Sequence, residues 1–184
     1  MHHPTRHIPY RSRLAAVGLG ALLLMLAGRQ ALAAGELEKA QALWMQGQRD
    51  TAQQMVRSAL TSNPNDARLR FALATMQMEQ GQLAEAERAL LALTQDHPDL
   101  ADPFNNLAVI RAGRGDLEAA RDALEQALRL QPEHAAALEN LGDVLVRLAA
   151  RAYERALPLA SGDKQALSLK LQRSRAVVNL KTSP

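Results

Sequence analysis

The chain has 184 residues, of which 47% are hydrophobic but only 3% aromatic, and its formal net charge is +3. The apolar content comes mostly from alanine and leucine, which favour helices over strands. Because the chain contains no cysteine, disulfide bonds, thiolate metal sites, cysteine nucleophiles and lipid attachment through an N-terminal cysteine are excluded.

Residues 1–33 are typical of a secretory signal peptide. A region with three arginines precedes the uncharged stretch Leu14–Ala27, and the sequence Ala31-Leu32-Ala33 then supplies a cleavage site of the A-x-A form. The apolar stretch is shorter than the roughly 20 residues that a membrane-spanning helix needs. We therefore expect export to a bacterial periplasm with cleavage after Ala33. An uncleaved N-terminal membrane anchor is the alternative.

Cleavage at this site changes the charge of the protein. It would remove four arginines and no acidic residue, so the net charge would fall from +3 to −1. The basic character of the whole chain therefore gives no support to a nucleic-acid partner. We expect a protein or peptide partner, with membrane contact only through a leader that is not removed; the oligomeric state is left open.

Beyond the leader, small residues and proline recur with a fixed period. Three glycines, three prolines and three alanines each repeat every 34 residues: Gly47, Gly81 and Gly115; Pro64, Pro98 and Pro132; Ala52, Ala86 and Ala120. Three residue types that share one period are typical of stacked structural repeats.

Each unit has the pattern of two helices, which is clearest in residues 101–130. Apolar residues follow a helical spacing on both sides of Gly115. Gly115 is expected to end the first helix with φ > 0, which costs glycine little. Asp116 is expected to cap the start of the second helix, and Pro132 to prevent its continuation.

The units resemble tetratricopeptide repeats, in which small residues stand where two helices cross closely. In the best unit the resemblance is carried by Ala108, Gly115, Ala120, Ala127 and Pro132. It covers roughly residues 34–157 and implies an all-α, right-handed superhelical solenoid of about three to four helix pairs. The usual large aromatics of the family are replaced at four positions, by Gln77, Leu90, Arg111 and Leu124.

The tripeptide Arg114-Gly115-Asp116 matches a known adhesion signal. The same turn one period earlier reads "GQL" at residues 81–83 and lacks the motif. We therefore interpret the tripeptide as the turn between the two helices of a repeat.

The period breaks in the fourth unit. Apolar residues continue at helical spacing without a glycine turn, at Leu138, Leu141, Leu145, Leu148, Ala152 and Ala156. We predict one continuous helix over about 134–157, ended by Pro158. Residues 158–184 are then predicted to form a capping helix with a basic tail, because the end of a stack needs a polar outer face.

Charge also changes at this break. Residues 36–146 carry a net charge of −7, and residues 147–184 carry +6. Arg147, Arg151 and Arg155 form a row at i, i+4 and i+8. The row is either a solvated face or a docking strip for an acidic partner or an anionic surface of the cell envelope.

Catalysis and cofactors are not indicated by any motif. His97 and His134 lie beside the repeat prolines with no second ligand at helical spacing, and the stretch "DHPDLADP" lacks the glycine and terminal glutamate of a calcium-binding loop. No nucleophile, phosphate-loop or zinc-protease pattern occurs. We expect no enzyme activity, no catalytic residues, no metal and no cofactor.

The resemblance instead indicates binding. The inner wall of such a stack is built from the first helix of each repeat, and in this family it holds a partner polypeptide. The residues expected to face it are Arg68, Phe71, Thr75, Asn105, Asn106, Val109, Glu139, Asn140 and Asp143. Asn106 and Asn140 are 34 residues apart and are expected to stack as a ladder that pairs with a peptide backbone; they could equally be tolerated surface residues.

The charges on this wall predict the character of the partner. Glu139 and Asp143 would repel a carboxylate, so a neutral or basic peptide is expected. We therefore predict a non-catalytic scaffold or adaptor for protein interactions in the cell envelope. The alternatives are a structural adaptor that docks through the basic C-terminal region and an accessory subunit of an envelope enzyme complex.

Overall fold

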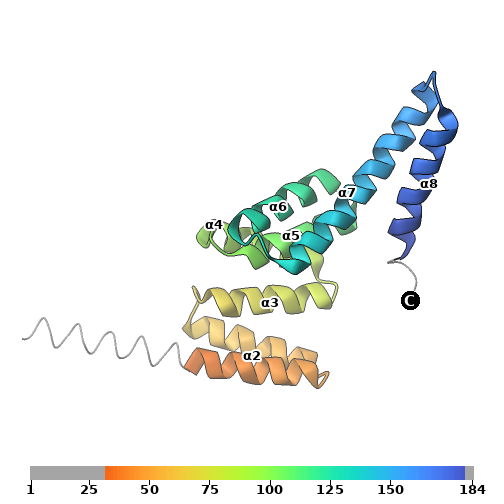
Figure 1. Ribbon diagram of the computed structural model, residues 1–184. Helices are drawn as coiled ribbons and strands as arrows, with labels where there is room; N and C mark the ends of the chain where they lie inside the picture. Colours follow the sequence, from red (N-terminus) through yellow and green to blue (C-terminus); the bar gives the residue numbers. More distant parts are fainter. Residues whose placement is uncertain (1–31, 181–184) are drawn as a thin grey trace, which may run out of the picture. The chain divides into compact units, whose positions relative to one another are not determined.

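The computed structural model describes residues 32–180, and within that range it contains eight α-helices, one short 3-10 helix and no strand (Figure 1). The chain divides into two compact units, Met1–Leu73 and Ala74–Pro184. Residues 1–31 of the predicted signal peptide lie outside the described residues, whereas Leu32 and Ala33 begin a helix over residues 32–45. None of the described helices is long and apolar enough to cross a membrane.

The first unit is built from the helix over residues 32–45, α2 (Arg49–Ser62) and the first half of α3 (Ala67–Glu79). Gly47 has φ 80° and forms the turn before α2, where its amide donates to the carbonyl of Trp44. Alanines form much of the buried surface here, and Ala40 and Ala52 are fully buried. Two helices can approach closely where their contacting side chains are this small.

The second unit begins with the second half of α3 and continues with α4 (Leu83–Asp96), α5 (Ala101–Arg114) and α6 (Leu117–Leu130). Gly81 and Gly115 have φ 76° and 86° and occupy the turns before α4 and α6. A buried cluster joins α5, α6 and α7, with Ala108, Ala120 and Leu124 among its members. The 34-residue period therefore places the same type of turn before α2, α4 and α6.

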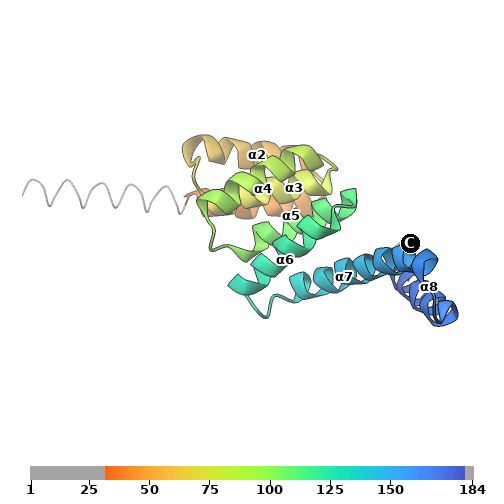
Figure 2. The ribbon, with the colours of Figure 1, turned by 90° about the horizontal axis from the view of Figure 1, so that it is seen from above.

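The fourth repeat is one long helix, as the sequence predicts. α7 spans Ala135–Ala156, and the 3-10 turn Leu157–Leu159 carries Pro158. α8 (Lys164–Leu180) then returns alongside α7, as both views show (Figures 1 and 2). Leu171 of α8 is buried and Leu167 is half-buried. The pair of helices within a repeat is thus replaced by a long hairpin of α7 and α8.

Candidate partner-binding groove

A chain of side-chain hydrogen bonds crosses the first helices of three successive repeats in the second unit. Asn140 on α7 donates from Nδ2 to Oδ1 of Asn105 on α5, at 2.9 Å. Asn105 donates to Oδ1 of Asn106 at 3.3 Å, and Asn106 donates to the hydroxyl of Thr75 on α3 at 3.3 Å. Three of the predicted groove residues are therefore linked to one another across helices that are far apart in sequence.

The arrangement of these amides differs from the expected ladder. Asn106 and Asn140 occupy the same place in their repeats, yet Asn140 bonds to Asn105, which is only 8% exposed. Asn105 lies between the other two because its side chain projects from α5 towards α7. Each amide has two donor hydrogens and two acceptor lone pairs. The half-buried Asn106 and Asn140 therefore keep hydrogen-bonding capacity after their mutual contacts are made.

Beside this polar chain lies a cavity of about 420 Å³ with mostly apolar walls. Its lining comes from α5, α6, α7 and α8: Ala108, Val109, Ala112, Gly113, Leu124, Asn140, Asp143, Val144, Val146, Arg147, Val177 and Val178. Val109 is 42% exposed although its neighbours in α5 are buried. The cavity can take an apolar side chain, while Asn140, Asp143 and Arg147 supply the polar groups.

The end of α8 forms one wall of this cavity. Val177 and Val178 belong to the last turn and a half of that helix and lie in the lining. The capping helix therefore narrows the groove at the fourth repeat but leaves it open. The sequence places α8 next to the stack, but it does not show that the helix would return far enough to reach the groove.

The polar groups at the cavity carry opposite charges. Asp143 and Arg147 stand one helical turn apart on α7, and both are half-buried. Arg147 makes no ion pair with any residue that the structure describes. Glu139 lies one turn before Asp143 and is exposed. Arg147, which its spacing in the sequence places in a row of basic residues, is thus also part of the groove.

The two other predicted groove residues, Arg68 and Phe71, belong to the first unit. Arg68 is exposed and pairs with Asp66 at 3.1 Å, and Phe71 is half-buried. Partial burial raises the pKa of the Asp66 carboxyl. The Arg68 side chain and the backbone amides of Leu69 and Arg68 donate hydrogen bonds that outweigh this and lower it below its usual value. Asp66 is therefore a charged cap for the first turn of α3.

Comparison with known sequences identifies the repeats. Profiles of the tetratricopeptide repeat match residues 43–105 and 105–164, and together they span well over half of the chain. The chain belongs to the tetratricopeptide repeat family. No curated protein sequence matches it. Together with the consecutive packing of α5 on α6 and α7, the match makes the fold an all-α tetratricopeptide repeat solenoid.

Several solved tetratricopeptide structures resemble this one. The first TPR of Spaghetti (RPAP3), bound to the HSP90 peptide SRMEEVD, has a TM-score of 0.59 and 21% identity, covering 64% of this chain and 93% of that chain. The second TPR domain of human RPAP3, in complex with the HSP70 peptide SGPTIEEVD, has a TM-score of 0.57 and 18% identity, covering 63% and 97%. YrrB, a TPR protein with an unusual peptide-binding site, has a TM-score of 0.52 and 30% identity, covering 56% and 54%.

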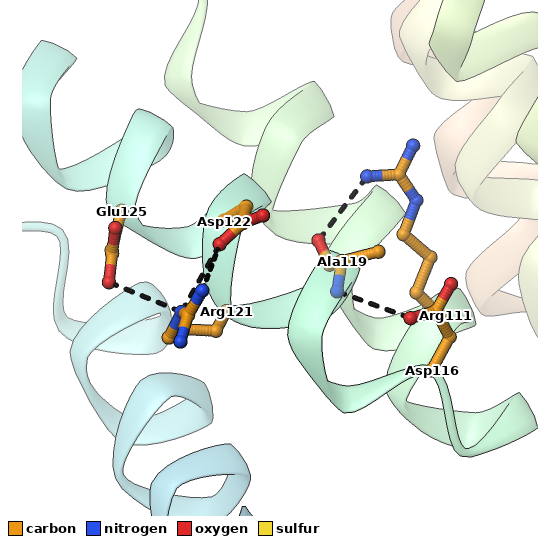
Figure 3. Close-up of polar contacts among 6 residues, drawn as sticks. All are labelled: Arg111, Asp116, Ala119, Arg121, Asp122 and Glu125. Carbon is orange, nitrogen blue, oxygen red and sulfur yellow. Dashed lines mark hydrogen bonds and ion pairs between the residues drawn. The ribbon is translucent and has the colours of Figure 1, made fainter.

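In this tetratricopeptide protein the tripeptide Arg114-Gly115-Asp116 is the turn between α5 and α6, as predicted. Arg114 pairs with Glu87 on α4, and Gly115 has φ 86°. Asp116 accepts a hydrogen bond from the amide of Ala119 at 3.2 Å, as Figure 3 shows. All three residues therefore serve the fold.

Arg111, which replaces a large aromatic of the family, also has a structural partner. Its guanidinium donates to the carbonyl of Ala119 on α6 at 3.3 Å and so joins the two helices of the repeat (Figure 3). On the exposed side of α6, a hydrogen bond to Asp122 raises the pKa of Arg121, and Glu125 lies 3.6 Å away. At the position of Arg111, α5 and α6 are thus joined by a polar contact where the family usually has a large aromatic side chain.

The three arginines of the predicted docking strip have different surroundings. Arg151 donates to the carbonyl of Gly115 at 2.6 Å and lies 3.6 Å from Glu118, so it ties α7 to the preceding turn. Arg155 is exposed. Arg147 and Arg151 also line a second cavity of about 210 Å³, together with Glu154 of α7 and Arg175 of α8. The docking role of the strip stays a prediction.

Residues capable of metal binding do not cluster in the described part of the chain. Within residues 32–180, no group of three histidine, aspartate or glutamate side chains could hold a metal ion. His134 instead accepts from the amide of Ala137 through Nδ1 at 3.3 Å and contacts Asp102 through Nε2 at 3.0 Å. It therefore caps α7 and connects it to α5.

Proposed function

We propose that this protein is a non-catalytic scaffold for protein interactions that holds a segment of a partner polypeptide in the groove of the second unit, along the second half of α3, α5 and α7. The observation that carries the proposal is the cavity of about 420 Å³ beside the Asn140–Asn105–Asn106 chain. The apolar wall of the cavity can bind an apolar side chain of a polypeptide. The neighbouring asparagine amides keep donors and acceptors that can bind its backbone.

The similarity to structures with bound peptides supports this use of the fold. The two RPAP3 domains carry peptides that end in the acidic sequence EEVD. In this chain Asp143 lines the cavity with Glu139 one helical turn before it, and Arg147 is the one cation in the cavity lining. The carboxylates of an acidic peptide would be repelled by Glu139 and Asp143. We therefore propose a neutral or basic segment that inserts one apolar side chain into the cavity.

We further propose that the protein acts in the bacterial cell envelope. This rests on the signal-peptide pattern of residues 1–33. The chain would be exported and cleaved after Ala33, or would stay anchored through its leader if cleavage fails. The test is the N-terminal sequence of the protein recovered from the periplasmic fraction.

The groove can be tested with a photocrosslinking side chain at Val109, introduced in the native cells. We expect it to capture a polypeptide that the same group at Leu83 does not. Leu83 suits a control because it is exposed to a similar degree but lies on α4, outside the cavity lining. The captured polypeptide is then purified and titrated against the protein.

In that titration Val109→Arg is expected to weaken binding by more than about tenfold, because it fills the cavity and adds a charge. Leu83→Arg adds the same charge elsewhere and is expected to leave affinity unchanged. Equal crosslinking at both positions, or equal affinity of the two variants, would contradict binding in the groove.

The second candidate function is docking to an acidic partner through the basic C-terminal region. It is favoured by the cavity of about 210 Å³ to which Arg147, Arg151 and Arg175 contribute. Contacts with exposed arginines weaken as salt is raised, because the charges are screened. This function predicts that capture is lost at high ionic strength and when Arg151 and Arg155, which do not line the groove, are replaced by glutamine. Groove binding predicts that capture survives high salt but is reduced by Asn106→Ala combined with Asn140→Ala.

A further inference from the structure

One face of α7 is apolar and about half exposed to solvent. Leu138 and Leu145 are 50% and 47% exposed, and Gly142 between them is exposed as well. The sequence pattern places them in one stripe with Leu141 and Leu148, but the structure separates the two sets. Leu141 and Leu148 pack against the buried cluster of α5 and α6, whereas Leu138 and Leu145 lie on the exposed surface of α7.

The 34-residue period indicates which kind of element packs on this face of α7. One repeat earlier, the equivalent positions are Phe104, Ala108 and Arg111. Phe104 and Ala108 pack in the cluster that includes α6, and Arg111 bonds to Ala119 of α6. The fourth repeat has no helix equivalent to α6, because α7 continues and α8 packs on a different side. The fourth repeat therefore keeps the surface on which the second helix of a repeat packs, but it lacks that helix.

Gly142 gives an independent reason to expect a close neighbour. A glycine inside a helix weakens that helix relative to alanine. Nothing in the part of the chain that the structure describes requires it, because a Cβ placed on Gly142 would meet no atom there within 4 Å. A glycine between two exposed leucines on one face allows another helix to approach closely.

The spacing of the face along α7 points to a matching helix. Leu138, Gly142, Leu145, Ala149, Ala152 and Ala156 follow each other at intervals of 4, 3, 4, 3 and 4 residues, and none is charged. This alternation gives the 3.5-residue period of a coiled-coil seam. We call these six residues the α7 seam. Both leucines of the seam lie in its first half, and its second half contains only alanines.

We propose that the α7 seam is the interface of a homodimer, in which α7 of a second copy of this chain packs antiparallel on it. In this pairing Leu138 lies opposite Ala156 of the second copy, Gly142 opposite Ala152, and Leu145 opposite Ala149. Each layer then joins a larger residue to a smaller one, and a two-fold axis relates the two helices. The seam is therefore complementary to itself.

The helix dipoles favour the same orientation. An antiparallel pair opposes the dipoles of the two α7 helices, whereas a parallel pair aligns them. Charged side chains of α7 lie away from the seam, because Asp143 and Arg147 line the groove and Arg151 donates to the carbonyl of Gly115. Asn140 and Asp143 face the groove, so the dimer leaves two open grooves.

The mass of the purified full-length chain in solution tests the dimer. Light scattering coupled to size exclusion is expected to give twice the mass of one chain at micromolar concentration. Leu145→Arg is expected to raise the dissociation constant of the dimer by more than about 100-fold, because the two-fold axis introduces the charge twice. Leu169→Arg is the matched control, since Leu169 is 45% exposed on α8 and lies outside the seam. Circular dichroism checks that both variants keep their helices.

The register can be tested by disulfide formation, because the chain has no cysteine of its own. A mixture of Leu145→Cys and Ala149→Cys chains is expected to crosslink between different copies, whereas a mixture of Leu145→Cys and Leu169→Cys is not. A monomer at all concentrations would overturn the proposal and leave the seam to a helix of another protein. A dimer that Leu145→Arg does not weaken would overturn it as well.

Discussion

The side chain of Asn140 on α7 donates a hydrogen bond of 2.9 Å to the side-chain carbonyl of Asn105 on α5. This bond joins two first helices of successive repeats at a place where Asn105 is almost completely buried. Asn105 in turn donates to Asn106. A buried amide in such a position stabilises the stack only if its partners are present, since an unsatisfied polar group inside a protein is costly.

We therefore predict that Asn105→Ala lowers the free energy of unfolding by about 1–3 kcal/mol. The loss arises because Asn140 and Asn106 each lose a partner. Urea unfolding followed by circular dichroism measures it. Gln95→Ala on the exposed side of α4 is the control and should change stability by less than about 0.5 kcal/mol. If Asn105→Ala and Asn140→Ala were fully additive in the double variant, the hydrogen bond would make no contribution.

Two glycines that are close in sequence are expected to respond oppositely to alanine. Gly115 has φ 86°, and a Cβ there would lie 3.4 Å from the Arg151 guanidinium, so Gly115→Ala should destabilise the protein by about 1–2 kcal/mol. Gly113 lies inside α5 and has open space around it, so Gly113→Ala should stabilise it by about 0.5–1 kcal/mol. The melting temperatures of the two variants measure this, and shifts of the same sign would contradict the explanation.

A buried glutamine offers a simple route to higher stability. Gln77 on α3 is only 8% exposed, and its Oε1 has no hydrogen-bond partner in the described part of the chain. Gln77→Leu removes the unsatisfied oxygen with little change of volume, and we expect it to stabilise the protein by about 1 kcal/mol. Gln95→Leu is the exposed control and should have little effect. A loss of stability in Gln77→Leu would mean that the glutamine has a water or other partner.

The sequence predicts the repeats well because they depend on local signals with a fixed period. Gly115 and Asp116 stand at the end of α5 and the start of α6 as expected. The long helix α7 was predictable because no glycine turn interrupts its apolar spacing. These features depend on neighbouring residues, so one sequence is sufficient to find them.

The site was less predictable, because it depends on how side chains from different helices meet. The period pairs Asn106 with Asn140, but the actual partner of Asn140 is Asn105, since α5 presents that side chain towards α7. Val177 and Val178 reach the cavity only because α8 folds back along α7. Their part in the lining depends on the hairpin angle after Pro158, which the spacing of apolar residues does not encode.

Acid should reveal the charged cap of α3. Asp66 accepts hydrogen bonds from the backbone amides of Arg68 and Leu69 at 2.9 and 3.3 Å, and from the Arg68 side chain at 3.1 Å. Burial raises its pKa, but these bonds favour the carboxylate, and the net effect is a lowered pKa. The stabilisation is therefore complete above the unfolded-state pKa of about 3.9. It is lost as the pH falls below this value and passes through the lower pKa of the folded protein.

The variant Asp66→Asn isolates this effect, because asparagine caps helices about as well as aspartate but does not titrate. We expect the wild-type protein to be the more stable of the two at pH 5 and to lose this advantage steadily as the pH is lowered below about 4. The difference between their free energies of unfolding removes the contribution of every other carboxylate. Arg68→Gln should reduce the pH dependence without abolishing it, since the two backbone bonds remain. Parallel curves for the wild type and Asp66→Asn throughout the acid range would show that Asp66 does not prefer its charged form in the folded protein.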